Sequence, residues 1–199
     1  MRKTAEGAEA DIYEDKVLGV NAILKRRRRK PYIAPELERE LRMQRTRTEA
    51  RIIGTLNGLG LNVPALLMVG RDTIRMVRID GTPLNEVRGL PRMHAIADSG
   101  QLLGRLHAVG IAHGDFTTAN MMISRDGALW LIDFGLASQH ASPEDKAMDV
   151  LLLKRSVNAE EYAAFARAYM KWQGAQQVMR RLASIERRGR YQTRTLESR

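Results

Sequence analysis

Three oxygen-bearing side chains near the middle of the chain have the types and the spacing that phosphoryl transfer uses. Asp115 and Asn120 lie five residues apart in the segment HGDFTTAN, residues 113–120. Asp133 follows thirteen residues after Asn120 and begins an Asp-Phe-Gly tripeptide. The Asp-Gly turn within residues 124–127 predicts a β-hairpin between them, which would bring the three side chains to one place. Mg²⁺ prefers such oxygen ligands, and a carboxylate can orient the attacking hydroxyl group.

The two segments resemble the catalytic loop of protein kinases and the metal-binding Asp-Phe-Gly that follows it. In that pattern a lysine at the end of a strand holds the nucleotide phosphates, and a glutamate on the next helix holds the lysine. Lys25 ends the apolar run of residues 22–24, and Glu49 lies on the next predicted helix. Each feature alone has a simpler interpretation. Glu49 could serve merely to offset the charge of neighbouring arginines, and Lys25 could simply be the first residue of the basic run 25–30. The combination, in this order, favours a kinase site.

The match to protein kinases is incomplete at three points. The glycine-rich phosphate loop is replaced by residues 6–10, which contain the single glycine Gly7. Gly114 stands where regulated kinases have an arginine that pairs with a phosphorylated activation loop, so we expect no such regulation. Only 64 residues follow Gly135, and the Ser-Pro-Glu of residues 142–144 comes too early to close a full activation segment. We therefore expect a reduced activation segment without a platform for a protein substrate.

The elements that must position these residues are predicted to form an α+β fold. Short strands are expected at residues 20–24 and 74–77. A long helix is expected from Pro35, and Gly58 and Gly60 signal its end. The residues that recur on its predicted apolar face, at steps of roughly three to four residues, are Leu37, Leu41, Thr48, Ile52 and Leu56.

The second part of the chain is predicted to be mostly helical. A helix is expected over residues 95–109, with Gly110 at its end, and short strands at residues 121–123 and 129–132. A capping box at residues 158–161 predicts the start of another helix. With the turn-rich segment 78–83 as connector, we expect an N-lobe over residues 1–78 and a C-lobe over residues 79–199.

Positive charge is concentrated in two segments. The chain has 33 Lys+Arg against 23 Asp+Glu, a formal net charge of +10. Residues 25–51 contain 11 basic and 4 acidic side chains, and residues 180–199 contain 7 basic and 2 acidic side chains. The rest of the chain is therefore nearly neutral. Two basic patches favour a phosphate-rich partner such as RNA, although a highly charged soluble surface would account for them as well.

Several classes of protein are disfavoured by composition. Cysteine is absent, which excludes disulfides and thiolate chemistry, and four scattered histidines do not indicate a zinc site. No apolar run approaches the roughly 20 residues of a membrane helix, so no membrane partner is expected. The first residues lack the apolar stretch of a signal peptide. We therefore expect a cytoplasmic protein.

Over almost its full length, the chain resembles the PRPK-type kinase/ATPase subunit of the KEOPS complex, in its archaeal form. The resemblance rests on residues 7–10, Lys25 with Lys30, Tyr32 and Pro35, RTxxEA at 45–50, GIxHGDxTTxN at 110–120, IDFGL at 132–136, EDKAxDV at 144–150 and RRGR at 187–190. The RTxxEA and EDKAxD segments are more specific than the catalytic motifs, which many kinases share.

This resemblance implies a minimal bilobal protein-kinase-like fold and a role for each matching residue. It implies Asp115 as catalytic base, Lys25 on the nucleotide phosphates with Glu49 as its partner, and Asp149 as a brace for the catalytic loop. It implies Asn120 and Asp133 as ligands of Mg²⁺, with Mn²⁺ as a substitute. The other nucleotide-binding residues that it implies are Gly7, Ala8, Glu9 and Ala10 over the phosphates and the hinge Met76, Val77, Arg78 and Ile79, whose backbone receives the adenine of ATP.

The implied function is that of an ATP-dependent, autophosphorylating kinase of the non-specific serine/threonine type, or an ATPase. It would act with a metalloprotein and other KEOPS subunits in the threonylcarbamoyladenosine (t6A) modification of tRNA, with tRNA contacts through residues 25–51 and 180–199. One alternative is a small-molecule kinase of the aminoglycoside/choline type, whose C-terminal lobe is usually longer. Another is a non-catalytic scaffold for RNA or partners, against which the filled catalytic positions argue. The intact Asp-Phe-Gly disfavours RIO-type kinases.

Overall fold

The structure is a computed structural model that describes residues 2–6 and 9–197, with side chains described for residues 2–4 and 9–188. Its elements fall into two compact units. The first unit contains the chain up to Gly81 together with Ser124–Leu136. The second contains Thr82–Ile123 and Ala137–Arg199.

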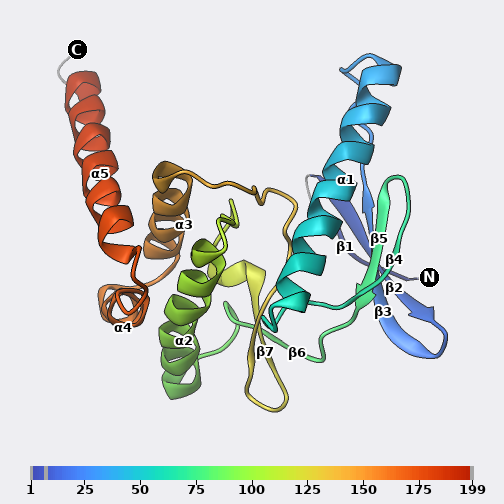
Figure 1. The fold of residues 1–199 in the computed structure, drawn as a ribbon, viewed down its shortest axis with the longest axis horizontal. Coiled ribbons are helices and arrows are strands. Elements are labelled where there is room, and N and C mark those ends of the chain that lie inside the picture. Colours follow the sequence, from blue (N-terminus) through green and yellow to red (C-terminus); the bar gives the residue numbers. More distant parts are fainter. Residues whose placement is uncertain (1, 7–8, 198–199) are drawn as a thin grey trace. The chain divides into compact units, whose positions relative to one another are not determined.

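An antiparallel sheet forms the frame of the first unit. Its strands are β1 (Arg2–Glu6), β2 (Ala10–Val17), β3 (Val20–Arg27), β4 (Leu66–Val69) and β5 (Thr73–Val77). They lie in the order β1-β2-β3-β5-β4 (Figure 1). A two-residue turn joins β2 to β3, and both of its residues, Leu18 and Gly19, have positive φ, as tight hairpins require. The strands predicted at 20–24 and 74–77 are confirmed, and the first of them extends to Arg27.

One face of this sheet is covered by α1 (Pro35–Gly58), which confirms the predicted long helix. Pro35 occupies its first turn, and Gly60, with a φ of +64°, follows its end. Ala50 of α1 lies in a buried apolar cluster with Ile74 and Met76 of β5, against which Ile23 of β3 packs. This packing fixes α1 against the strand that carries Lys25.

The first turns of α1 differ from the predicted apolar face. Leu37 and Leu41 are 52% and 38% exposed. The buried side chains there are polar: Glu38, Thr46 and Glu49 are each at most 5% exposed. Ion pairs and hydrogen bonds hold these groups, so hydrophobic periodicity alone identifies the wrong face in this part of the helix.

The second unit is built from helices. They are α2 (Gly89–Ala108), the 3₁₀ turn η1 (Thr118–Asn120), α3 (Pro143–Ser156), α4 (Ala159–Tyr169) and α5 (Ala175–Glu197). The predicted helix over 95–109 begins earlier, at Gly89, and Gly110 follows its end with a φ of +75°. The capping box predicted at residues 158–161 is confirmed at the start of α4. At Gly100 of α2 a Cβ atom would collide with the carbonyl oxygen of Phe165 in α4, so glycine permits this close helix contact.

Three short strands, β6 (Gly81–Pro83), β7 (Met121–Ser124) and β8 (Leu129–Leu131), form a second sheet in that order. The predicted hairpin between residues 121 and 132 is therefore confirmed. Its turn has Gly127 at a φ of +84°, and the Gly127 N–H donates to the Ser124 carbonyl at 2.9 Å. Strand β6 lies in the segment predicted to be only turn-rich. None of the helices within the described residues combines the length and apolarity that a bilayer crossing requires.

Candidate active site

Lys25 is the centre of the site in the first unit. Its Nζ donates to Glu49 Oε1 at 2.7 Å and to Asp133 Oδ1 at 2.6 Å. The side chains of Lys25 and Glu49 are only 6% and 1% exposed, and charges so deeply buried require partners. Strand β3 supplies Lys25, α1 supplies Glu49, and the segment after β8 supplies Asp133. The structure thus brings three of the predicted site residues together.

Arg27 joins this group although it was not predicted. It lies two residues after Lys25 on β3 and therefore projects from the same face of the strand. It is 5% exposed, and its Nη2 bonds Glu49 Oε2. Glu49 thus holds Lys25 on one oxygen and Arg27 on the other. The two-residue spacing of Lys25 and Arg27 was the available signal, but it lies within a continuous run of basic residues.

The Asp-Phe-Gly tripeptide adopts an unusual backbone. Asp133 has a φ of +60°, a region that residues other than glycine rarely occupy. Its Oδ1 accepts from the Gly135 N–H at 3.0 Å, and Phe134 is buried at 1% exposure. A Cβ at Gly135 would lie 3.0 Å from Asp133 Oδ1 and 3.2 Å from Lys25 Nζ. The glycine therefore leaves room for the Lys25–Asp133 ion pair, and such backbone strain is typical of functional sites.

Asp115 and Asn120 form a second cluster, in the second unit. Asn120 Nδ2 donates to Asp115 Oδ2 at 2.8 Å and to the Asp115 carbonyl oxygen at 2.9 Å. The Thr117 N–H donates to the same carbonyl at 2.9 Å. These bonds fix the Asp115 carboxylate. Because they use the side-chain nitrogen of Asn120, the Asn120 side-chain oxygen remains as the atom suited to a cation.

Asp149 binds the backbone of the loop that precedes Asp115, the contact that the resemblance implied. It is fully buried on α3 and accepts the His113 N–H at 2.7 Å and the Gly114 N–H at 2.8 Å. Gly114 has a φ of +78°, which explains why glycine suits this position. The brace thus holds the backbone immediately before Asp115.

His107 supports this brace and was not predicted. Its Nε2 lies 3.1 Å from Asp149 Oδ2, and its Nδ1 lies 2.8 Å from the Tyr169 hydroxyl. Burial lowers the pKa of His107, although the Asp149 carboxylate opposes this effect. Burial also raises the pKa of Tyr169. A neutral His107 can therefore donate from Nε2 to Asp149 while Nδ1 accepts from Tyr169.

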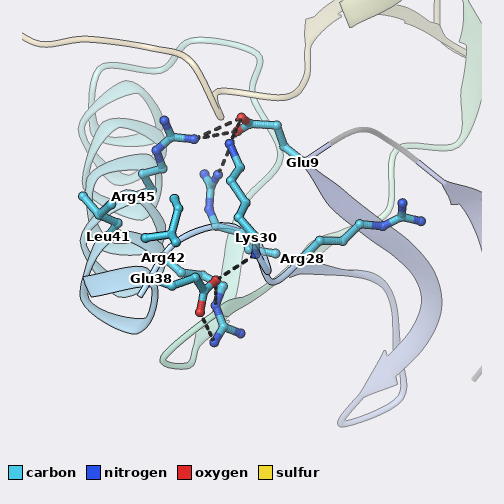
Figure 2. Close-up of a pocket in the computed structure, with 9 residues that line it drawn as sticks. Glu9, Arg28, Lys30, Glu38, Leu41, Arg42 and Arg45 are labelled. Atoms are coloured by element: carbon cyan, nitrogen blue, oxygen red, sulfur yellow. Dashed lines mark hydrogen bonds and ion pairs between the residues drawn. The ribbon is translucent and has the colours of Figure 1, made fainter. Parts of the chain in front are cut away.

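The predicted phosphate cover is described only in part. Gly7 and Ala8 lie outside the described residues, and Ala10 begins β2. Glu9 is engaged with α1 and the segment before it: Lys30 Nζ and Arg45 Nη1 lie 3.0 and 2.9 Å from its carboxylate (Figure 2). Partial burial raises the pKa of Glu9, but the hydrogen bonds from Lys30 and Arg45 outweigh it, so the pKa is lowered.

The predicted hinge continues the end of β5. The Val77 N–H donates to the Ala65 carbonyl at 2.8 Å, and the Arg78 N–H donates to the Asn21 carbonyl at 3.0 Å. Met76 is buried beneath them at 8% exposure. Among the described residues, the N–H of Ile79 has no hydrogen-bond partner. Unlike the N–H groups of Val77 and Arg78, that of Ile79 is thus not used within the described residues.

The oxygen donors predicted for a magnesium ion lie one in each unit, Asp133 in the first and Asn120 in the second. Within residues 2–6 and 9–197, no three His, Cys, Asp or Glu side chains are grouped as they would be around a metal ion. The Asp133 side chain is 50% exposed, and Asn120 offers an amide oxygen. Mg²⁺ is usually held by one or two protein ligands together with phosphates and water. Each unit therefore supplies one oxygen donor of the kind that Mg²⁺ binds together with phosphates and water.

Comparison with known proteins places these residues in a family context. The family model described as RIO domain matches residues 22–173. This overturns the expectation that the intact Asp-Phe-Gly disfavours a RIO-type lineage, because the match includes that tripeptide. Asp-Phe-Gly supplies a metal ligand and a turn in many kinases, so its presence does not separate their lineages.

Relatives are found among archaeal proteins. The chain is 34% identical over 217 residues to "KEOPS complex subunit Bud32" of Pyrococcus abyssi, with 98% of each chain covered. It is 40% identical over 200 residues to the "Probable bifunctional tRNA threonylcarbamoyladenosine biosynthesis protein" of Methanothermobacter thermautotrophicus, which covers 94% of this chain and 36% of that protein. A protein of the same description from Methanoculleus marisnigri is 39% identical over 194 residues, which cover 94% of this chain and 35% of that protein. The chain therefore spans about a third of these bifunctional relatives.

Solved structures share the fold. The Rio2 kinase from Chaetomium thermophilum, crystallised as an ADP/Mg²⁺-phosphoaspartate complex, superposes with a TM-score of 0.66 at 18% identity, covering 94% of this chain and 70% of that one. Another crystal structure of the same kinase gives a TM-score of 0.65. At this identity the likeness concerns the fold alone, and it confirms the predicted α+β, protein-kinase-like fold.

Proposed function

The chain belongs to the RIO-domain family and to the family of the KEOPS complex subunit Bud32, and on that premise we propose that it is an ATP-dependent kinase or ATPase that serves the t6A modification of tRNA. The observation that carries the proposal is the contact of Lys25 with both Glu49 and Asp133. A cation held in this way is suited to nucleotide phosphates. The proposed partners are a metalloprotein subunit and the other subunits of KEOPS.

In the proposed reaction each cluster has one task. Lys25 holds the α- and β-phosphates of ATP, and Glu49 and Arg27 keep Lys25 in place. Asp115, fixed by Asn120, orients the attacking hydroxyl group or water and accepts its proton. Asn120 and Asp133 supply oxygen ligands to Mg²⁺, for which Mn²⁺ can substitute. When bound, the metal ion neutralises the charge that develops on the transferred phosphoryl group.

The contact between Lys25 and Asp133 represents the resting arrangement in this proposal. Lys25 Nζ lies 2.6 Å from the Asp133 oxygen that would otherwise be available to a cation. On nucleotide binding, Lys25 exchanges this carboxylate for phosphate oxygens. The exchange would leave the Asp133 carboxylate available to hold Mg²⁺.

Further details belong to the same proposal. The transfer is of the serine/threonine type, including self-phosphorylation, and it takes place in the cytoplasm. Residues 1–78 form the nucleotide-binding lobe, in which the phosphates are covered by Gly7, Ala8, Glu9 and Ala10. The N–H of Ile79 donates a hydrogen bond to the adenine. Residues 79–199 carry the catalytic loop. The basic segments 25–51 and 180–199 contact tRNA phosphates.

The decisive experiment measures Mg²⁺-dependent ATP hydrolysis and ³²P self-labelling, with and without partner subunits and tRNA. Asp115→Ala should lower both rates by about 100-fold or more, because it removes the positioned base. Asp98→Ala, which removes an exposed carboxylate from α2, is the matched control and should leave both rates unchanged. Full turnover by a pure Asp115→Ala preparation would show that the proposed site is wrong.

A further inference from the structure

A pocket with a strongly basic lining lies in the first unit beside the first turns of α1 (Figure 2). Five of its lining side chains are cations: Arg27, Arg28, Lys30, Arg42 and Arg45. Only two, Glu9 and Glu38, are acids, and Ile33 and Leu41 supply apolar wall. The pocket is formed by the end of β3, the segment that follows it, and α1. Such a lining is suited to an anion.

The Glu9 carboxylate already lies where an anion would bind. Lys30 Nζ and Arg45 Nη1 lie 3.0 and 2.9 Å from it, and Arg27 Nη1 lies 3.7 Å away. Figure 2 shows the side chains of Lys30 and Arg45 converging on Glu9 from the segment after β3 and from α1. Three cations therefore share one carboxylate, which carries a single charge on two oxygens.

A phosphate group matches these three cations better than a carboxylate does. A phosphomonoester carries a charge of about −1.5 to −2 at neutral pH and three strong acceptor oxygens. Charge-assisted hydrogen bonds from arginine and lysine to such oxygens are among the strongest in proteins. Arg27 is also paired with Glu49, whereas Lys30 and Arg45 both rely on the single charge of Glu9.

The pocket combines accessible and buried donors. The side chains of Arg45 and Lys30 are 48% and 33% exposed, so an anion from solvent can reach them. Arg27 is 5% exposed, and its Nε is buried without a hydrogen-bond partner. A buried donor that lacks an acceptor is costly, so the guanidinium of Arg27 is incompletely satisfied in this arrangement.

We propose that this pocket is a phosphate-binding site, in which a phosphate group displaces the Glu9 carboxylate from Lys30, Arg45 and Arg27. The ligand class is inorganic phosphate or a phosphomonoester on a serine or threonine side chain. The pocket shares Glu9 with the proposed cover of the ATP phosphates. It requires no phosphoryl transfer by this chain, and Lys30 and Arg45 have no role in the proposed reaction. Its occupancy releases Glu9, and with it the start of β2, from α1.

The test is a calorimetric titration of the full chain with inorganic phosphate at constant ionic strength, with chloride as the reference anion. Arg45→Gln and Lys30→Gln should each weaken phosphate binding about tenfold or more, because each removes one charge-assisted contact. Glu9→Gln should tighten binding about tenfold, because the resident carboxylate no longer competes. A purely structural role for these ion pairs would not give opposite effects for Glu9 and Arg45.

Arg47→Gln is the matched control, since Arg47 is exposed on α1 only two residues after Arg45. It should leave phosphate binding unchanged. Equal weakening by Arg47→Gln would mean that net charge, and not the pocket, attracts the anion, and this result would overturn the proposal. Absence of saturable phosphate binding in both the unmodified chain and Glu9→Gln would overturn it as well.

The source of the phosphate is resolved by competition. A serine-phosphorylated peptide that displaces inorganic phosphate, when its unphosphorylated form does not, supports a phosphorylated side chain as the ligand. Failure of the phosphopeptide to compete, with phosphate binding intact and sensitive to Arg45→Gln, supports the free anion. Phosphate binding that survives Arg45→Gln undiminished would place the anion elsewhere and overturn the proposal.

Discussion

Glu49 holds two buried cations, one on each carboxylate oxygen. Lys25 Nζ is 2.7 Å from Oε1, and Arg27 bonds Oε2. With Glu49 only 1% exposed, water cannot replace the carboxylate if it is lost. Removing one partner from a buried ion pair is costly because the remaining charge stays buried without compensation.

Glu49→Gln should therefore affect stability as well as turnover. We expect the free energy of unfolding to fall by about 3 kcal/mol, because Lys25 and Arg27 lose their shared counter-charge. ATP turnover should fall in the same variant, since Lys25 is no longer held. Urea unfolding and ATP hydrolysis measure the two effects. Glu40→Gln, an exposed position on the same helix, is the control, and an equal loss in both variants would contradict this role of Glu49.

Individual residues could be predicted where a motif fixes their spacing. Lys25, Glu49 and Asp133 were identified from their order along the chain, and the structure brings them together. Arg27 and His107 could not be identified in the same way. Arg27 lies within a basic run, and the role of His107 depends on Asp149 and Tyr169, which are distant in sequence. Such contacts follow from packing rather than from local pattern.

At the scale of elements, signals at helix ends were the most informative. Pro35 and Gly60 marked the ends of α1, and Asn158 with Glu161 marked the start of α4. The strands β1, β2, β4 and β6 were not predicted. They are short or rich in charged residues, as in the sequence ADIYEDKV of β2, and only pairing with neighbouring strands makes them regular.

His107 joins three helices behind the catalytic loop. It projects from α2, Asp149 from α3 and Tyr169 from α4. Lys146 of α3 also acts on His107 and contributes to lowering its pKa, while burial makes the largest contribution. Because burial in this packing disfavours the charged imidazole, protonation of His107 is linked to the packing of all three helices.

The stability of the protein should therefore fall on mild acidification. Because the folded state lowers the pKa of His107 below its usual value of about 6.5, the unfolded chain takes up this proton at a higher pH than the folded chain does. The free energy of unfolding should drop by up to about 1.4 kcal/mol per pH unit below pH 6.5. Urea unfolding between pH 7.5 and 5.5 measures this slope. His107→Gln, which retains one donor and one acceptor, should flatten it, and an unchanged slope would contradict the linkage.

At the scale of the whole molecule, the net charge of +10 overstates the number of cations available to a partner. Six basic residues of the segment 25–51 are engaged in ion pairs: Lys25, Arg27, Arg28, Lys30, Arg42 and Arg45. In the C-terminal segment, Arg181 and Arg188 share Glu144. Within the described side chains, the other five basic residues of the segment 25–51 are exposed and have no acidic partner: Arg26, Arg29, Arg39, Arg47 and Arg51. The net charge alone could not distinguish the basic residues that are held in ion pairs from those that are exposed without an acidic partner.

The unpaired arginines of α1 should therefore dominate any contact with tRNA. The double variant Arg47→Gln/Arg51→Gln should weaken tRNA binding and reduce the slope of log affinity against log salt by about 2, because each lost phosphate contact lowers the slope by roughly 0.9. Arg71→Gln/Arg125→Gln removes the same charge from exposed positions outside both basic segments. Fluorescence anisotropy with labelled tRNA between 50 and 200 mM salt, roughly the range over which such contacts weaken, measures both variants. Equal losses in the two variants would assign tRNA binding to overall charge, whereas a loss confined to the α1 variant assigns it to this helix face.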